Sequence, residues 1–323
     1  MNANLIERKL TAVQPWEGGA YFQSWFPLCL SSQLEPGTVL GRAFLNTRVV
    51  LYRDKAGRAV VQSGYCPHFG ADLSLGSLSD GELRCIYHQW HFNSEGRCTR
   101  IPSGDPVPRN ARIHNYPVAE TLGMVWAYNG EKPLFPVPAF PAQEDELIYK
   151  VSERADQPVD AWIPPSNSVD FQHLLSIHHF PTTAIPSTIE VAPFSLGYKT
   201  DFMHPEGEGK VWGCNTFVQH SLLPLPFETF TLFTSTAVKP NVCRPFFVAA
   251  VRKPANPAEL PAARERLEEV FRFSQNLYVE DEPVLNTIRI RQPGEAMLVK
   301  SDAGLAKFFK YIADLPQARP PDA

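Results

Sequence analysis

Alternating apolar and polar residues predict β-strands through the first 130 residues. Residues 45–62, LNTRVVLYRDKAGRAVVQ, contain a β-branched and aromatic run, a DKAG turn and a second apolar run, which predicts a hairpin. Short strand-like runs separated by Gly, Asp and Ser turns continue to Tyr128. This part of the chain is therefore expected to be a small all-β domain.

The pattern changes after this domain. Residues 129–165 contain the run NGEKPLFPVPAFPAQEDE, whose prolines and acids predict a connector. Residues 167–179, NSVDFQHLLSIHH, follow a Pro-Pro-Ser start and carry apolar residues at helical spacing, so a short helix is expected there.

The rest of the chain predicts a sheet followed by a helix. Strand-like runs between residues 187 and 252 predict a broad antiparallel sheet. Residues 257–287 have the periodicity of a long amphipathic helix. The tail, LPQARPPDA, is expected to be frayed.

Composition supports a globular chain with more than one domain. The 323 residues exceed what one core usually fills, and 44% hydrophobic with 20% charged residues argues against disorder. The 31 prolines are about twice the usual share, which favours sheets and loops over a helix bundle. The net charge of -4 provides no basic surface for nucleic acid. Because no apolar run approaches a membrane span and the start lacks a signal segment, a cytoplasmic protein without membrane contact is expected.

The six cysteines divide into two groups. In a reducing compartment they favour a metal or catalytic role over disulfides. Four have no ligand-like neighbour and are interpreted as buried small hydrophobes: Cys29, Cys98, Cys214 and Cys243. The other two belong to a distinct motif.

That motif consists of Cys66-Pro-His68 and Cys85-Ile-Tyr-His88. Two thiolates and two imidazoles at neighbouring loop tips suit a [2Fe–2S] cluster, with Cys ligands on one iron and His ligands on the other. A Cys₂His₂ zinc site is the alternative, but zinc fingers usually place the two Cys together and the two His together. Here each pair mixes Cys with His, which favours iron–sulfur. Unrelated core positions are a second alternative, which the turn-rich flanks of both tips argue against.

The pattern C-x-H, a spacer and C-x-x-H followed by aromatic residues resembles the Rieske domain of Rieske non-haem iron oxygenases. The resemblance assigns Cys66 and Cys85 to one iron, and His68 and His88 to the other. The family usually has Gly after the second His, where this chain has Gln89.

His91 lies close to the second tip. The four residues that fit the ligand pattern all precede it. We interpret His91 as a surface residue or one that supports a ligand.

A second constellation lies in the predicted short helix. Asp170, His173 and His178 place two His five residues apart and an acid three residues before the first. On a helix, positions 170 and 173 share a face. Two imidazoles and one carboxylate leave open positions on Fe(II), as dioxygen chemistry requires. A polar stripe on a helix is the alternative, and His179 could replace His178 in another helix register.

Together with Asn167, these residues form Asn-x-x-Asp-x-x-His-x-x-x-x-His, which resembles the catalytic motif of the same oxygenase family. The resemblance implies that His173 and His178 ligate a mononuclear Fe(2+). It also implies that Asp170 binds the imidazole of His173 and faces a Rieske histidine of a neighbouring subunit. The motif follows the Rieske pattern in the order that the family has.

The third iron ligand is expected to be a carboxylate from the C-terminal helix. The family carries a Glu-Asp pair at a similar place, and the resemblance maps its Asp to Asp281. Glu280 and Glu282 are the alternative ligands. A solvated acidic face of the helix is the alternative to any ligand role.

The resemblance implies a terminal oxygenase of the α+β class. A Rieske domain (1–135) would precede a helix-grip catalytic domain (136–323) with an antiparallel sheet and a C-terminal helix. NAD(P)H would supply electrons through a ferredoxin or flavin reductase, and Fe(II) would activate O2 beside a small apolar substrate. The length and motif are most similar to the homotrimeric monooxygenase, demethylase and ketosteroid-hydroxylase branch. Hydroxylation, demethylation and desaturation all remain open, as do one or two incorporated oxygen atoms.

Residues 185–275 are expected to line the substrate pocket, either as pocket wall or as ordinary core. The aromatic residues singled out in this region are Phe194, Tyr198, Phe202, Phe217, Phe227, Phe230, Phe233, Phe246 and Phe247. Two other classes of protein are weighed: a Rieske electron carrier, which needs only the first domain, and a non-catalytic helix-grip ligand-binding protein. The intact second motif argues against both.

Overall fold

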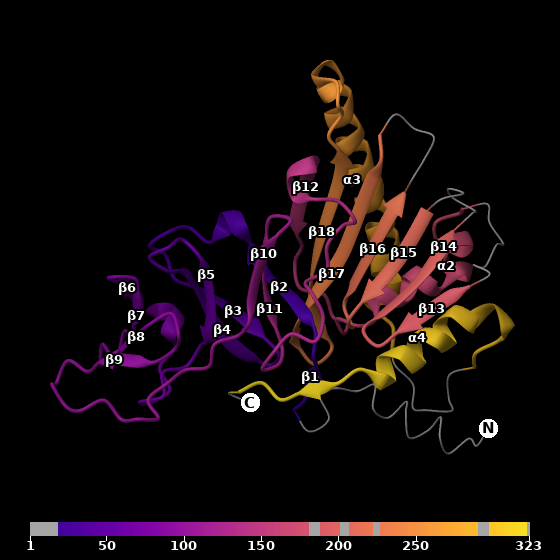
Figure 1. Ribbon diagram of the computed structural model, residues 1–323. Coiled ribbons are helices and arrows are strands. Elements are labelled where there is room, and N and C mark those ends of the chain that lie inside the picture. The colour runs from indigo at the N-terminus through magenta and orange to yellow at the C-terminus, as the bar shows by residue number, and fades with distance from the viewer. Residues whose placement is uncertain (1–18, 181–187, 201–206, 222–226, 290–296, 322–323) are drawn as a thin grey trace.

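The structure is a computed structural model that describes residues 19–180, 188–200, 207–221, 227–289 and 297–321. Small sheets at one end of the molecule adjoin one large sheet that carries the helices (Figure 1). This is the α+β architecture that the sequence predicts.

The N-terminal part consists of three small antiparallel sheets. The predicted hairpin is confirmed, because Thr47–Arg53 pairs with Ala59–Ser63 across a turn that Asp54 stabilises. The first sheet contains β2 (Trp25–Leu30), β10 (Val118–Thr121) and β11 (Met124–Tyr128). The second contains β3 (Leu40–Phe44), β4 (Thr47–Arg53) and β5 (Ala59–Ser63). The third contains β6 (Ser77–Ser79), β7 (Glu82–Arg84), β8 (His91–Phe92) and β9 (Cys98–Arg100).

A seven-stranded antiparallel sheet forms the second part, which confirms the predicted broad sheet. Its spatial order is β12 (Leu147–Glu153), β18 (Val242–Arg252), β17 (Thr229–Lys239), β16 (Thr216–Ser221), β15 (Gly207–Trp212), β14 (Ser195–Thr200) and β13 (Ile189–Ala192). The prediction that residues 129–165 are wholly a connector is wrong, because β12 lies within them. Its sequence LIYKVSE has a strand pattern that the preceding prolines and acids obscure.

The predicted long helix is confirmed as α3 (Leu260–Leu285). It packs against β18 because Ala263, Leu267 and Val270 form a buried cluster with Phe247 and Ala249. A second C-terminal helix, α4 (Ala303–Asp314), was not predicted. Short 3-10 turns occur at Ser31–Gln33, Leu73–Leu75, Glu144–Glu146, Pro257–Glu259 and Lys300–Asp302.

The predicted helix at 167–179 is broken into two elements. A 3-10 turn, Pro164–Val169, is followed by α2 (Phe171–Ser176), with Asp170 between them. Asp170 has φ -93° and ψ 83°, which is not helical, and its carboxylate accepts a hydrogen bond from the backbone N–H of His173. It is therefore the N-cap of α2, and the short helix ends before His178.

The prediction of a frayed tail is wrong. Gln317 and Ala318 form β19, which pairs with β1 (Tyr21–Phe22), and Leu315 is buried. Such pairing between the two ends of the chain leaves no local signal in a proline-rich tail. None of the described helices is long and apolar enough to cross a membrane.

Candidate metal centres

The two Rieske-type tips have the same backbone conformation. The N–H of Gly70 donates to the carbonyl of Cys66 at 2.8 Å, and the N–H of Gln89 donates to that of Cys85 at 3.1 Å. Gly70 has φ 76° and Gln89 has φ 56°, so both occupy the left-handed region that favours glycine. The departure from the usual Gly at Gln89 therefore leaves the loop conformation intact.

The structure brings the four predicted cluster residues together with thiols inside and imidazoles outside. Cys66 and Cys85 are 3% and 1% exposed, whereas His68 and His88 are exposed with ring centroids 4.5 Å apart. His68 stacks on Trp90 at 4.5 Å. Burial raises the pKa of Cys66 to about 12, so the thiolate needs a nearby positive charge such as a metal. Paired thiols beside paired imidazoles fit a [2Fe–2S] cluster with mixed ligands.

His91 is buried, which corrects its interpretation as a surface residue. It is 2% exposed, and its ring nitrogens lie 3.5 Å from Glu82 Oε2 and 2.5 Å from an Arg100 nitrogen. Burial and then the Arg100 guanidinium lower the pKa of His91. The residue joins β7, β8 and β9 behind the tips. The predicted burial of the other four cysteines is confirmed for Cys29, Cys98, Cys214 and Cys243.

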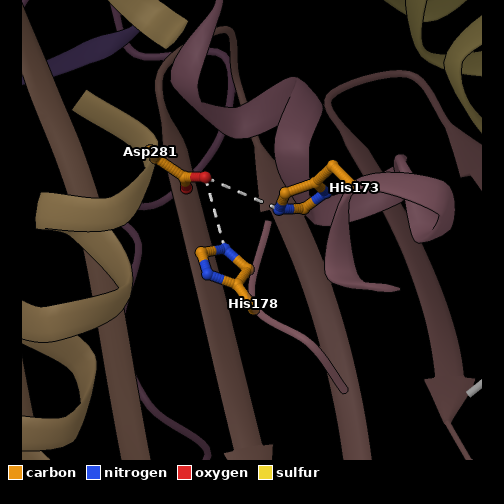
Figure 2. Close-up of side chains that lie close together, drawn as sticks. All are labelled: His173, His178 and Asp281. Carbon is orange, nitrogen blue, oxygen red and sulfur yellow. Dashed lines mark ion pairs between the residues drawn. The ribbon is translucent and has the colours of Figure 1, made fainter. Parts of the chain in front are cut away.

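A second cluster joins α2, the loop after it and α3 (Figure 2). One ligand atom from each of His173, His178 and Asp281 lies within 4.8 Å of the other two. Asp281 Oδ1 is 3.2 Å from His178 Nε2 and 3.9 Å from His173 Nε2. Their side chains are between 2% and 15% exposed. Two imidazoles and a carboxylate on one side of a small space suit Fe(II) with open coordination positions.

The remaining nitrogen of each imidazole is held by an oxygen. His178 Nδ1 lies 2.7 Å from Glu280 Oε2, and His173 Nδ1 forms a short hydrogen bond with the main-chain carbonyl of Asp170. Because these oxygens accept, both Nδ1 atoms carry the proton and both Nε2 lone pairs are available to a metal. Burial alone would lower the pKa of His178, but the Asp281 and Glu280 carboxylates, which accept hydrogen bonds from the protonated ring, outweigh burial and raise it.

The expected contact between the Asp170 carboxylate and the His173 imidazole is wrong. The carbonyl of Asp170 makes that contact, while its carboxylate caps α2 through the N–H of His173. The helix break explains the exchange, because an N-cap side chain turns toward the free N–H groups of the first turn.

The alternative ligands lie elsewhere. Glu280 binds the far side of His178, and Glu282 pairs with Arg154 at 3.2 Å and with Gln157 at 3.0 Å. His179 is exposed, with φ 56°. The contact of Glu280 was not predicted, although its place next to Asp281 was a usable signal.

His173, His178 and Asp281 line a cavity of about 210 Å³ between α3 and the large sheet. Asn167 also lines it. Of the predicted aromatic residues, Tyr198, Phe217, Phe233 and Phe246 line this cavity, and Phe180, Phe273 and Tyr278 were missed. Phe202 lies outside the described residues. Four others are packed in hydrophobic clusters: Phe194, Phe227, Phe230 and Phe247.

Known proteins resemble both parts of the chain. The Rieske [2Fe-2S] domain model matches residues 24–117. The oxygenase subunit of 3-chlorobenzoate-3,4-dioxygenase from Comamonas testosteroni is 36% identical over 123 residues, which are 37% of this chain and 28% of the relative. Cholesterol 7-desaturase from Xenopus laevis is 35% identical over 166 residues, 49% of this chain and 36% of the relative. The chain therefore spans about a third of the length of these two relatives.

The similarity of fold extends over the whole chain. The structure of NdmA from Pseudomonas putida CBB5 aligns with 98% of this chain and 99% of its own, with a TM-score of 0.71 and 19% identity. These findings confirm the resemblance to the Rieske oxygenases at the level of domain and fold. The chain contains a Rieske [2Fe-2S] domain at residues 24–117 and shares the fold of NdmA along nearly its whole length.

Proposed function

We propose that this chain is the terminal oxygenase component of a system that oxidises an apolar aromatic, steroid-like or terpenoid-like substrate with O2. The observation that carries the proposal is the presence of two different sets of metal-binding side chains in one chain. Mixed Cys/His tips suit electron transfer, and a His–His–Asp cluster beside a cavity suits dioxygen chemistry. The matched relatives are named for a chlorobenzoate and for cholesterol, which agrees with an apolar ring as substrate.

In this proposal the tips hold the cluster at the surface. Cys66 and Cys85 bind the buried iron, while His68 and His88 bind the outer one. The exposed apolar side chains around them suit docking of a protein partner: Tyr65, Phe69, Ile86 and Tyr87. That partner is a ferredoxin or flavin reductase, or a second copy of this chain.

The second cluster would hold the mononuclear iron through His173, His178 and Asp281. Fe(II) in such a site binds and activates dioxygen through its open positions. Glu280 and the carbonyl of Asp170 orient the two imidazoles, and Asp281 supplies negative charge as well as a ligand atom. The cavity wall holds the substrate beside this centre and excludes water.

Electrons would pass between subunits of a homotrimer. In Figure 1 the strands β6–β9 of the Rieske part and helix α2 lie at opposite ends of the molecule. A route within one chain would therefore have to run from one end of the molecule to the other. Asp170 lies beside His173, and we propose that its carboxylate joins His88 of a neighbouring subunit. We also propose a boundary between the two domains at residues 135 and 136, between β11 and β12.

Metal analysis with a turnover assay tests the proposal. The purified chain should contain three iron and two acid-labile sulfide per chain, and reduced cluster should be reoxidised by O2 faster when a substrate is present. A product screen with a surrogate reductase and a panel of apolar compounds then identifies the reaction. Two iron per chain would instead indicate an electron carrier or a non-catalytic ligand-binding protein. Zinc without acid-labile sulfide would exclude the [2Fe–2S] cluster.

A further inference from the structure

We propose that the end of the cavity far from Asp281 binds a carboxylate, so that the substrate is an elongated apolar acid. The hydrocarbon part would reach the histidine–aspartate cluster while Arg266 and Thr231 hold the acid group. This inference rests on the proposed function, because it defines the substrate of the same centre.

One stripe of helix α3 forms a wall of the cavity. Arg266, Val270, Phe273, Leu277 and Asp281 all line it and recur at three- or four-residue spacing, so they share one face of the helix. Fifteen residues separate Arg266 from Asp281, which corresponds to about 22 Å along the axis at 1.5 Å per residue. The cavity is therefore elongated, with the metal ligands at one end and a guanidinium at the other.

The floor of the cavity changes from aromatic to polar toward Arg266. Across β16 and β17, Phe217 pairs with Phe233, and the next two inward pairs are Gln219–Thr231 and Ser221–Thr229. All six residues line the cavity.

The packing of β18 identifies which end is polar. Thr231 pairs with Ala249, which is clustered with Ala263 and Leu267 from the first turns of α3. The polar pairs therefore lie near Arg266, and the aromatic pair lies nearer to the metal ligands.

Two polar groups at this end lack partners among the described residues. Thr231 is 8% exposed and its hydroxyl makes no hydrogen bond there, and the buried Nε of Arg266 is also without one. One terminal nitrogen of Arg266 pairs with Glu269 at 3.1 Å, but Glu269 is 54% exposed, so solvent weakens that pair.

Buried polar groups without partners are unfavourable and rare, so these two are expected to bind a ligand. A carboxylate has acceptors for both the guanidinium and the hydroxyl, and its charge complements Arg266. A neutral alcohol of the same length lacks that charge.

Calorimetric titration of the metal-loaded protein with decanoate and 1-decanol tests the proposal. Wild type should bind decanoate at least tenfold more tightly than decanol. Arg266→Gln should lose about tenfold or more in decanoate affinity with little change for decanol, and Arg266→Lys should fall between. Thr231→Val, of similar shape, should lose several-fold for decanoate. Arg264→Gln, an exposed arginine on the same helix that does not line the cavity, is the matched control and should change nothing.

Three results would contradict the proposed carboxylate site. These are equal affinity of wild type for both compounds, no binding of decanoate, and unchanged decanoate affinity in Arg266→Gln. Iron content and cluster absorbance are measured on the same samples. Three iron per chain without a preference for decanoate would contradict the carboxylate site but would still agree with the oxygenase proposal. Two iron per chain contradicts the oxygenase proposal itself.

Discussion

The two candidate metal centres are built in different ways. The Rieske tips come from one short stretch, and each tip is a local turn closed by a hydrogen bond between residues four apart. The second centre joins His178 to residues 102 and 103 positions later, on α3. The first centre exposes its imidazoles, and the second buries them. A site made of local turns can therefore be identified from spacing, whereas a site that joins distant elements depends on how they pack.

Removing a ligand should separate the two centres completely. His173→Ala, His178→Ala and Asp281→Ala should each reduce iron from three to two per chain and leave the cluster spectrum unchanged. Cys85→Ser should remove the cluster and leave the mononuclear iron. Metal and sulfide analysis with EPR of the reduced protein measures both. If Asp281→Ala retains three iron, another carboxylate is the third ligand.

Asp170→Asn should disconnect the centres without emptying either. Asparagine is as good an N-cap as aspartate, so α2 should remain intact while the charge is lost. Stopped-flow reoxidation of the reduced cluster by O2, with substrate present, should be nearly abolished. Asp170→Ala controls for the cap and should add about 1 kcal/mol of destabilisation. Wild-type reoxidation in Asp170→Asn would disprove the electron route through this residue.

Asp160 is a buried carboxylate that belongs to neither candidate metal centre. Burial raises the pKa of Asp160 to about 6, from an unfolded value near 3.8. The protonated Asp160 carboxyl contributes its full stabilisation of the folded state below pH 4. This stabilisation is lost as the pH rises through 6. Asp160→Asn should therefore be more stable than wild type at pH 8 by up to about 3 kcal/mol, and similar below pH 4. Denaturant unfolding at both pH values measures this, and a pH-independent difference would refute it.

Glu280→Gln should lower the affinity of the second centre for iron by about 10- to 100-fold. The reason is that the partner of a ligating histidine fixes the orientation and basicity of its imidazole. Chelator competition measures the affinity. Glu268→Gln is the matched control, because this exposed glutamate of α3 pairs with Lys150, far from the ligands. Equal iron affinity in the two variants would show that Glu280 does not support His178.

The smallest effects should come from exchanging the residues that close the two tips. Gly70→Gln should destabilise the first tip by about 1 kcal/mol, because a side chain is introduced at φ 76°. Gln89→Gly should change stability by no more than about 1 kcal/mol, since relieved strain is offset by the flexibility of glycine in the unfolded chain. Thermal loss of cluster absorbance compares the variants. A larger loss in Gln89→Gly than in Gly70→Gln would show that the two turns are not equivalent.

The sequence by itself determined the features that depend on neighbours in the chain. The hairpin before Ser63, the broad sheet, α3 and the two Cys/His tips follow from alternation, helical periodicity and turn residues, which act over a few positions. The His pair of the second motif could also be identified, because its spacing is local.

Only the tertiary structure decided the rest. The Asp170 N-cap replaced the expected carboxylate contact with a carbonyl contact, because α2 begins at Phe171, four residues later than the predicted start at residue 167. Three other features bring together residues from different strands, helices or loops. These are the pairing of β19 with β1, the packing of buried His91 against Glu82, and the contact of Glu280 with His178. The hydroxyl of Thr231 and the guanidinium of Arg266 share one cavity because α3 packs across β17 and β18. Such contacts depend on how whole elements pack, and no short pattern in the sequence encodes them.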